Sequence, residues 1–485
     1  MSIANALNNA VSGLTAAARG TEVVSSNLAN ALTPGYARRE VSLSPRTLSA
    51  NGGGVQVDRI VRIISDSVLA DLRLSSAALG KATASHEFFQ SLEKAIGLPG
   101  DATSLSAHLT ELETTLQSAA SRPDSAVRLR AVFNAATELT KKLASVSDVI
   151  QENRTTADRK IAQQVNKLKN NLEEVTRLNR QIIVERAHGR DASSFIDTRQ
   201  ELINQISEIV PVREMERENG RIALFTASGA VLLDGKSPTQ IDFRPSGKLT
   251  AEMASDSTLL GRLTIDDEVL SDAQISLFKG GSLSALFKVR DTHGIEAQKE
   301  IDVIARELYE RFADPATDPT LTTDMAGLFI DGTGSFDPVK EPGLATRLRV
   351  NAAVDEGQGG NLWRIRDGIA ASIQGDAGAS ETLLAMANAL AESKSYHSAT
   401  TNGAQGDLNN LVASLLSNAS SSRLTAENRL THAKNLTESL QDAIFTDAVD
   451  SDREMQMLLQ LEAAYAANAK VIQAVDEMME SILRI

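Results

Sequence analysis

Apolar side chains recur in alternating steps of four and three residues at both ends of the chain, and this heptad pattern constrains the fold most. The N-terminal pattern passes through Ile3, Leu7, Ala10, Leu14, Ala17, Thr21, Val24, Leu28 and Ala31. The C-terminal pattern passes through Met457, Leu461, Ala464, Asn468, Val471, Val475, Met478, Ile482 and Ile485, with a second row at Leu458, Tyr465, Ile472 and Met479. Each pattern predicts a helix of about 43 Å, so the two helices can lie side by side.

The C-terminal helix is predicted to have a wider apolar face than one partner helix can cover. The N-terminal helix is narrow, and Gly13 and Gly20 each weaken it by about 1 kcal/mol relative to Ala. Apolar surface should therefore remain after the two ends have paired. The pattern is typical both of helices that dock on the protein's own body and of helices that pack against other chains, and both alternatives stay open at this point.

The stretch SSNLANALTPGY predicts where the first helix ends. Pro34 lacks a backbone N–H and disfavours helix at the preceding residue, while Gly35 can supply a turn with positive φ. The helix should therefore end near Leu32. Asn27 and Asn30 then lie close to its end, where they are suited to capping or to polar contacts with neighbours.

Composition narrows the possible functions. The chain has 485 residues, a net charge of -14, no cysteine and only 4% aromatic residues. This composition favours helix-on-helix packing and argues against a nucleic-acid partner, disulfides, Cys-ligated zinc and thiol chemistry. The first charged residue is Arg19, so the basic start of a Sec signal is missing, and no apolar run approaches the ~18 residues of a membrane span.

No motif predicts an enzyme. The six histidines, His86, His108, His188, His293, His397 and His432, form no metal pair. The segments SGAVLLDGKSPT and DGTGSFDP imitate a phosphate loop and a calcium loop, but their spacings do not fit, so turns explain them better. We therefore predict no catalytic residue, no cofactor and no metal.

The middle of the chain predicts long helices interrupted by a β domain. One helical pattern runs from Ser125 for up to sixty-odd residues, between Pro123 and Gly189, and Ser194 is predicted to cap a helix that ends before Pro211. The fold class is thus mainly α, with an inserted β domain, a long helical bundle and a terminal coiled coil of the N- and C-terminal helices. We interpret the chain as nested segments: a terminal coiled-coil domain from 1–60 and 441–485, a helical middle domain from 61–209, 283–313 and 361–440, a β domain at 210–282, and a loop and strand segment at 314–360 that is a candidate to complete the β domain.

The two ends resemble the bacterial flagellar axial proteins, the rod, hook and hook-associated family. The stretches that carry the resemblance are LNNAVSGLTAAARG, SSNLANALTPGYARREV and LLQLEAAYAANAKVIQAVDEMMESILRI. Within the family, Thr33-Pro34-Gly35-Tyr36 followed by Arg38 resembles the hook-associated members of the hook–filament junction, whereas rod and hook proteins tend to have Thr-x-Gly-Phe. The chain departs from the family pattern at Leu28, at Ala31-Leu32 and at Arg19-Gly20.

The resemblance implies a structural subunit of the flagellum that joins hook and filament and templates filament assembly through its terminal helices. It implies self-association into a ring or helical tier, contacts with hook protein and a second junction protein, and an export chaperone at the C-terminal helix. It also implies an extracellular location, reached by type III export without a cleaved signal. The subunit-interface residues that we predict are Ile3, Leu7, Leu14, Val24, Asn27, Leu28, Asn30, Pro34, Gly35, Tyr36, Met457, Leu461, Tyr465, Asn468, Val471, Ile472, Val475, Met478, Ile482 and Ile485.

Two alternatives remain. The chain could be another flagellar axial protein, of the rod, the hook or the second junction layer. It could also be a secreted adhesion or binding protein whose β domain grips a surface ligand, although 210–282 contains only Phe225, Phe243 and Phe278 as aromatic residues.

Overall fold

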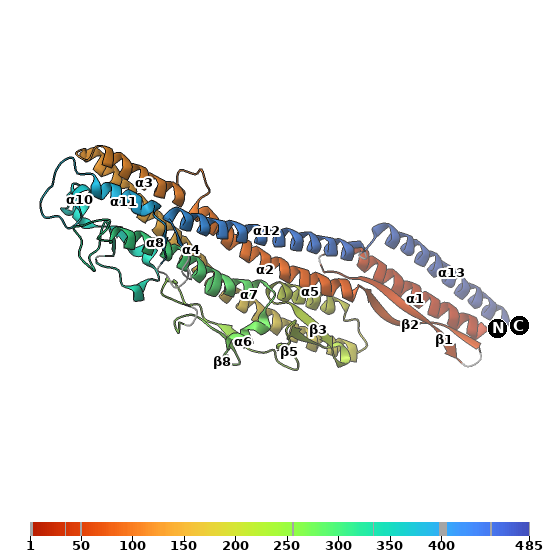
Figure 1. Cartoon of the computed structure of the whole chain (residues 1–485). Helices are drawn as coiled ribbons and strands as arrows, with labels where there is room; N and C mark the ends of the chain where they lie inside the picture. The colour runs from red at the N-terminus through yellow and green to blue at the C-terminus, as the bar shows by residue number, and fades with distance from the viewer. Residues whose placement is uncertain are drawn as a thin grey trace.

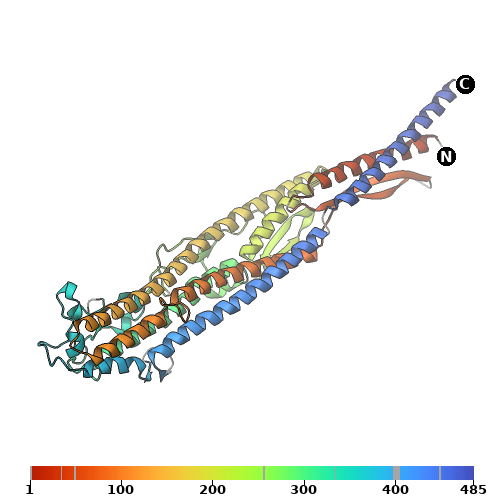
Figure 2. The same cartoon turned by 90° about the horizontal axis from the view of Figure 1, so that it is seen from above.

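Long helices that follow the predicted apolar pattern run along most of the molecule. The structure is a computed structural model that describes residues 3–33, 35–48, 51–254, 257–332, 334–396, 405–446 and 449–484. The molecule is elongated, with both chain termini at the same end (Figure 1). Viewed from above, the terminal helices continue the long axis of the helical body (Figure 2).

The terminal end contains two helices and one β-hairpin. Helix α1 spans Ile3–Ala29 and helix α13 spans Ser451–Leu483. Strands β1 (Arg38–Leu48) and β2 (Asn51–Ile63) pair antiparallel next to them. The first helix thus ends slightly before the predicted Leu32.

The helical body contains the longer central helices. Its helices are α2 (Asp66–Ile96), α3 (Leu105–Ser121), α4 (Ala126–Ala187), α5 (Ser193–Ile209), α7 (Ser282–Lys288), α8 (Gly294–Phe312), α11 (Glu381–Ala391) and α12 (Leu408–Thr446). The 62-residue α4 confirms the predicted long helix, and it ends just before Gly189, whose φ is +68°. The predicted cap of α5, Ser194, was wrong: the cap position is Ala192, and α5 begins at Ser193, whose backbone N–H donates to Asp191 Oδ1 over 3.0 Å.

The β insertion consists of two small antiparallel sheets. One contains β3 (Val212–Glu216), β4 (Ile222–Thr226) and β5 (Val231–Leu233), and the other contains β6 (Ile241–Phe243), β7 (Leu263–Ile265) and β8 (Glu268–Val269). The short helix α6 (Asp272–Ile275) leads from the second sheet back to the body. These strands confirm a β insertion in a mainly α chain.

The segment 314–360 was considered as a completion of that β domain. Its strands β9 (Phe329–Asp331) and β10 (Leu348–Val350) pair with each other in a separate sheet. They lie against α8 and α4 rather than extending either sheet of the insertion. The remaining short elements are α9 (Leu344–Arg347), α10 (Arg364–Asp367) and the strand pair β11 (Lys394–Ser395) and β12 (Gln405–Gly406).

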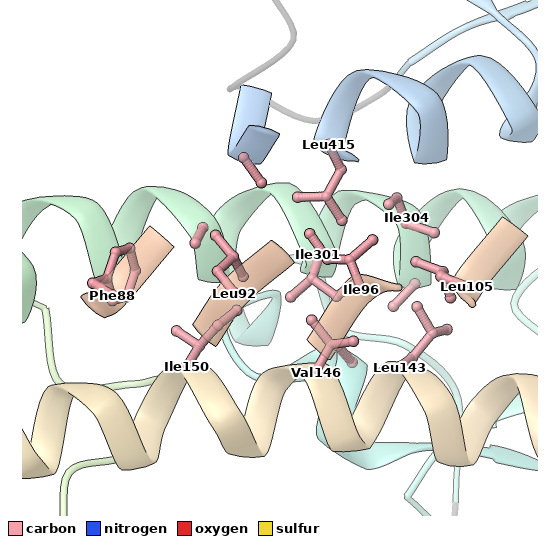
Figure 3. Packing of buried hydrophobic residues seen from close by; sticks show 14 of the residues in the cluster. Phe88, Leu92, Ile96, Leu105, Leu143, Val146, Ile150, Ile301, Ile304 and Leu415 are labelled. Carbon is pink, nitrogen blue, oxygen red and sulfur yellow. The ribbon is translucent and has the colours of Figure 1, made fainter. Parts of the chain in front are cut away.

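The core forms where five helices meet. Figure 3 shows this region, in which side chains of α2, α3, α4, α8 and α12 converge. The labelled residues are Phe88, Leu92, Ile96, Leu105, Leu143, Val146, Ile150, Ile301, Ile304 and Leu415. Aliphatic side chains dominate, which agrees with the low aromatic content and leaves α2, α4 and α12 as one continuous body.

A buried carboxylate joins α8 to the 314–360 segment. Asp302 accepts hydrogen bonds from the backbone N–H groups of Gly343 (2.7 Å) and Ala345 (2.9 Å) and from Gln298 Nε2 (3.1 Å). Burial outweighs these hydrogen bonds and raises the pKa of Asp302 to about 7.

This carboxylate predicts a pH-dependent stability. The folded protein keeps a proton on Asp302 that the unfolded chain releases above about pH 4, so the contribution to the free energy of unfolding falls as pH rises towards 7. Urea unfolding should be measured at pH 4.5 and at pH 8, in about 0.1 M salt. Between these two pH values, the free energy of unfolding should fall less for Asp302→Asn than for the parent. The difference should be about 1.4 kcal/mol for each unit by which the pKa of Asp302 differs between the folded and the unfolded chain. The same pH dependence in both proteins would mean that Asp302 is ionised throughout.

Candidate assembly interface at the chain termini

The two terminal helices pack antiparallel in one continuous register. Gly13 lies opposite Asn468, Gly20 lies opposite Leu461, and Asn27 is hydrogen-bonded to Glu454. Each step of seven residues along α1 therefore corresponds to a step of seven back along α13. This register confirms that the two heptad patterns belong to helices that pair with each other.

The two glycines of α1 allow close approach of the helices. A Cβ atom on Gly20 would lie 2.8 Å from Leu461 Cδ2, and one on Gly13 would lie 2.8 Å from the side-chain amide of Asn468. From sequence these glycines only weaken a helix. In the structure they make room for side chains of α13, so their cost in helix propensity is offset by packing.

Substitution of Gly20 tests this close packing. Gly20→Val should weaken the α1–α13 pair by about 1–3 kcal/mol, because the added branches overlap with Leu461. The exposed Ala18→Val is the matched control and should cost below about 1 kcal/mol, the difference in helix propensity. Hydrogen exchange of α1 and α13 amides gives the opening free energy. Equal effects of the two substitutions would contradict a packing role for Gly20.

The residues of α13 that pack against α1 do not coincide with either of the two apolar rows predicted from the sequence. The side chains that are buried or half-buried in the pair are Leu458, Leu461, Asn468, Ala469, Ile472 and Val475. The other predicted positions stay exposed: Met457 by 41%, Tyr465 by 45%, Val471 by 42%, Met478 by 47% and Ile482 by 58%. The pair covers Leu461, Asn468 and Val475 of the first row together with Leu458 and Ile472 of the second row. The predicted surplus of apolar surface on α13 is confirmed.

We define the exposed stripe of α13 as Met457, Ala464, Val471, Met478 and Ile482. These residues recur at steps of seven or four and so share one side of the helix. All five are exposed in the single chain. The stripe is an unpartnered helix face of the kind that packs against another helix.

Helix α1 also packs on the β-hairpin. The backbone N–H of Val55 donates to Ser12 Oγ over 3.2 Å, and a Cβ on Gly54 would clash with the same hydroxyl. Sequence reasoning missed this hairpin. The signal was present, because the glycines after Asn51 separate two stretches with β-branched and other apolar residues at alternate positions, as in VQVDRIVRI.

Asn27 is the polar centre of the terminal end. Its side chain is fully buried, and its Nδ2 donates to Glu454 Oε2 (3.0 Å) and to the carbonyl oxygen of Arg39 (2.9 Å). Its Oδ1 accepts from Tyr36 Oη (2.9 Å) and from the backbone N–H of Arg39 (3.0 Å). One side chain therefore joins α1, the turn after it, β1 and α13. Glu454 also accepts from Arg38 Nη1 over 3.3 Å, which balances its buried charge.

A second polar cluster joins the hairpin to the helical body. Asp197 on α5 accepts from Arg39 Nη2 (2.7 Å) and from Arg62 Nε (2.8 Å), and Arg62 Nη2 also reaches Gln200 Oε1 (2.8 Å). The Arg39 guanidinium lies 4.8 Å from the centre of the Tyr36 ring. Nothing in the heptad patterns indicated Arg39, Arg62, Asp197 or Glu454, because their partners lie far away in sequence.

The structure places the predicted residues of the turn and of α1 as follows. Gly35 has φ of +78°, which confirms its proposed conformation. Asn30 donates to the carbonyl oxygen of Ser26 within its own turn over 2.9 Å. Pro34 and Ile485 lie outside the described residues. On α1, Val24 is buried, while the predicted positions that are half-buried are Ile3, Leu7, Leu14 and Leu28.

Within the described ranges, no group of three or more His, Cys, Asp or Glu side chains is placed to hold a metal ion. In the same part of the chain, no helix is both long enough and apolar enough to cross a bilayer.

Family models match the two ends and the middle of the chain. The model described as flagellar hook-associated protein FlgK helical domain matches residues 89–317. The model described as flagella basal body rod protein matches residues 7–36, and the one described as flagellar basal body rod FlgEFG protein C-terminal matches residues 446–485.

Similar proteins carry a consistent name. Flagellar hook-associated protein 1 of Bacillus subtilis is 24% identical over an alignment that covers 98% of this chain and 97% of that protein. The protein of that name from Salmonella typhimurium is 26% identical over 59% of this chain, and the matched part spans about half of its length, 51%. A solved structure of the flagellar hook junction protein FlgK from Burkholderia pseudomallei has a TM-score of 0.45 and 16% identity, covering 54% of this chain and 47% of that one.

These comparisons agree with one another. Rod-protein models match both ends, a hook-associated helical-domain model matches between them, and one alignment covers nearly the whole of two chains. Along nearly its whole length, the chain is similar to flagellar hook-associated protein 1.

Proposed function

We propose that the chain is a structural subunit of the bacterial flagellum that forms the junction between hook and filament and templates filament assembly by packing of its terminal helices. The observation that carries this proposal is the exposed stripe of α13, which remains outside the residues that pair with α1. A terminal helix with one face paired inside the chain and one face free is suited to meet neighbouring subunits.

The interface would be heterologous, because each subunit must contact its neighbours through different faces to generate a ring or helical tier. We propose hook protein on one side and a second junction protein on the other. Before export, a cytoplasmic chaperone would cover α13. Export by the flagellar type III route and an extracellular location follow from this role, and the chain would act without catalysis or cofactor.

Substitutions on the exposed stripe test the assembly mechanism. Val471→Asp and Met478→Asp should leave the isolated protein folded, because both side chains are already exposed by more than two fifths. Each should still block incorporation, since an unpaired carboxylate would be buried in an apolar interface. Gln473→Asp adds the same group on another side of α13, at an exposed position, and should leave swimming intact. Normal swimming of Val471→Asp and Met478→Asp cells would remove the stripe from the interface.

Deletion of the gene tests the place in the flagellum. Electron microscopy of the deletion strain should show finished hooks without filaments, and unpolymerised flagellin should accumulate in the medium. Missing hooks would assign the protein to the rod or hook instead, and normal filaments would contradict a structural role in the flagellum.

A further inference from the structure

An arginine-lined crevice lies between the terminal hairpin and the helical body. Its volume is about 1380 Å³, and its lining contains eight arginines and five acidic residues, in a chain whose net charge is -14. The arginines come from α1, β2, α2, the end of α4 and the connection after it, α5 and β3, so the walls belong to both parts of the molecule. We call this cavity the arginine crevice; the residues that matter below are Arg59, Arg62, Arg73, Arg186, Arg199 and Arg213.

Two of these positive charges meet at Gly220. Arg199 Nη1 donates to the carbonyl oxygen of Gly220 and to Asn179 Oδ1, each over 2.8 Å. The Arg186 guanidinium lies against the same glycine, where a Cβ atom would be only 2.2 Å from Nη1. Burial is the main cause that lowers the pKa of Arg199 to about 10; the charges of Arg186 and Arg62 contribute to this lowering, and Glu214 opposes it. The crevice therefore concentrates like charges in a poorly hydrated place.

Several of the arginines lack a carboxylate partner. Among the described residues, no carboxylate oxygen lies within 4.0 Å of the guanidinium nitrogens of Arg59, Arg186, Arg199 or Arg213. A charge cluster of this kind destabilises the chain unless a counter-charge binds.

A buried guanidinium nitrogen gives independent support. Arg73 is only 5% exposed, and its Nε and Nη1 donate to Asn204 Oδ1 and Glu214 Oε2, each over 3.0 Å. Its Nη2 is buried and has no hydrogen-bond partner among the described residues. Because buried polar atoms are nearly always paired, Arg73 is a crevice-lining side chain whose hydrogen-bonding capacity is only partly satisfied.

We propose that the arginine crevice binds a multivalent oxyanion of the phosphate class. Guanidinium groups match phosphate oxygens with paired, charge-assisted hydrogen bonds, and several uncompensated cations suit a multivalent anion better than a single carboxylate. Since Arg59 and Arg62 belong to the hairpin whereas Arg186 and Arg199 belong to the body, a bound anion would link the two parts and fix the angle between them.

Calorimetric titration of the full chain with pyrophosphate, in chloride buffer of constant ionic strength, tests the proposal. The parent should bind pyrophosphate saturably. Arg186→Gln should raise the dissociation constant by about tenfold or more, because one guanidinium group and its charged hydrogen bonds are lost. Arg262→Gln removes an exposed arginine that does not line the crevice and should bind within about twofold of the parent. Absence of saturable binding up to about 10 mM pyrophosphate, or equal affinity of the parent and Arg186→Gln, would overturn the proposal.

Hydrogen exchange separates a built site from general attraction of anions. Pyrophosphate should slow exchange of amides in β2 and around Gly220, and chloride at the same ionic strength should not. Arg73→Lys keeps the positive charge but removes the unpaired nitrogen, so it should weaken binding while circular dichroism shows an unchanged helical content. Slowing of exchange by chloride to the same extent would reduce the crevice to an ordinary basic surface.

Discussion

Asn27→Ala should open the terminal end of the molecule. The substitution removes one partner of Glu454, of the Tyr36 hydroxyl and of the backbone N–H and carbonyl oxygen of Arg39, around a side chain that is itself fully buried. Glu454 then keeps Arg38, and the Tyr36 hydroxyl keeps Ser26 Oγ at 3.3 Å. Each unpaired buried group costs about 1–3 kcal/mol, so we expect the opening free energy of the α1–α13 pair to fall by about 3–5 kcal/mol. Hydrogen exchange of α1 and α13, with the central helices as an internal reference, measures this loss.

Asn30→Ala is the matched control. Asn30 lies one turn after Asn27 but contacts only its own turn, so its removal should cost below about 1 kcal/mol. Asn27→Asp is the stronger variant, because it places a second carboxylate beside Glu454, 3.0 Å from the present amide nitrogen. It should abolish hook–filament joining in cells, whereas Asn30→Ala cells should swim. Similar exchange rates in Asn27→Ala and Asn30→Ala would show that the Asn27 hydrogen bonds do not hold the terminal end together.

Asp197→Ala should detach the hairpin from the helical body. It removes the one carboxylate that contacts both Arg39 and Arg62, whose side chains are only 11% and 15% exposed. Breaking one partner of a buried pair costs about 3–5 kcal/mol, because the remaining charge loses its compensation. We expect the free energy of unfolding to fall by about 3 kcal/mol. This is the low end of the range, because some water reaches these groups. Urea unfolding followed by a fluorescent label on β1 would measure it.

Asp58→Ala is the corresponding control for Asp197→Ala. Asp58 is an exposed carboxylate on the same hairpin, and its side chain accepts from Ser44 Oγ over 2.8 Å. Loss of such a surface interaction should change stability by below about 1 kcal/mol. If Asp197→Ala unfolds like Asp58→Ala, water compensates the two arginines and the cluster is not a structural link. Small-angle scattering should also show a wider range of angles between the hairpin and the body in Asp197→Ala alone.

The sequence predicts the helical parts of this molecule best. The buried face of a helix appears in the sequence as apolar residues at regular spacing. Apolar spacing alone therefore predicted α4 and the pairing of the two ends. The positive φ of Gly35 was equally accessible, since glycine is the residue that adopts it without strain. The resemblance to flagellar axial proteins followed from short terminal motifs, which the matches at residues 7–36 and 446–485 bear out.

The contacts that join the parts were not accessible from periodicity. Asp197 meets Arg39 and Arg62 only because the chain folds back over more than a hundred residues, and each of these residues looks like an ordinary surface charge in its local sequence. Likewise, two rows on α13 both fitted a heptad, yet the pair covers some members of each, with Gly13 opposite Asn468 and Gly20 opposite Leu461. The division into nested domains and the interface residues themselves stay predictions.

The length of α4 gives small movements at its base a large effect. Its 62 residues make a strut of about 93 Å, and its last residues border the arginine crevice beside the hairpin. A tilt of about 5° at that end would move the opposite end by about 8 Å at this length. If the body turns about this end as one rigid unit, a small rotation beside the hairpin becomes a much larger displacement at the far end of the molecule.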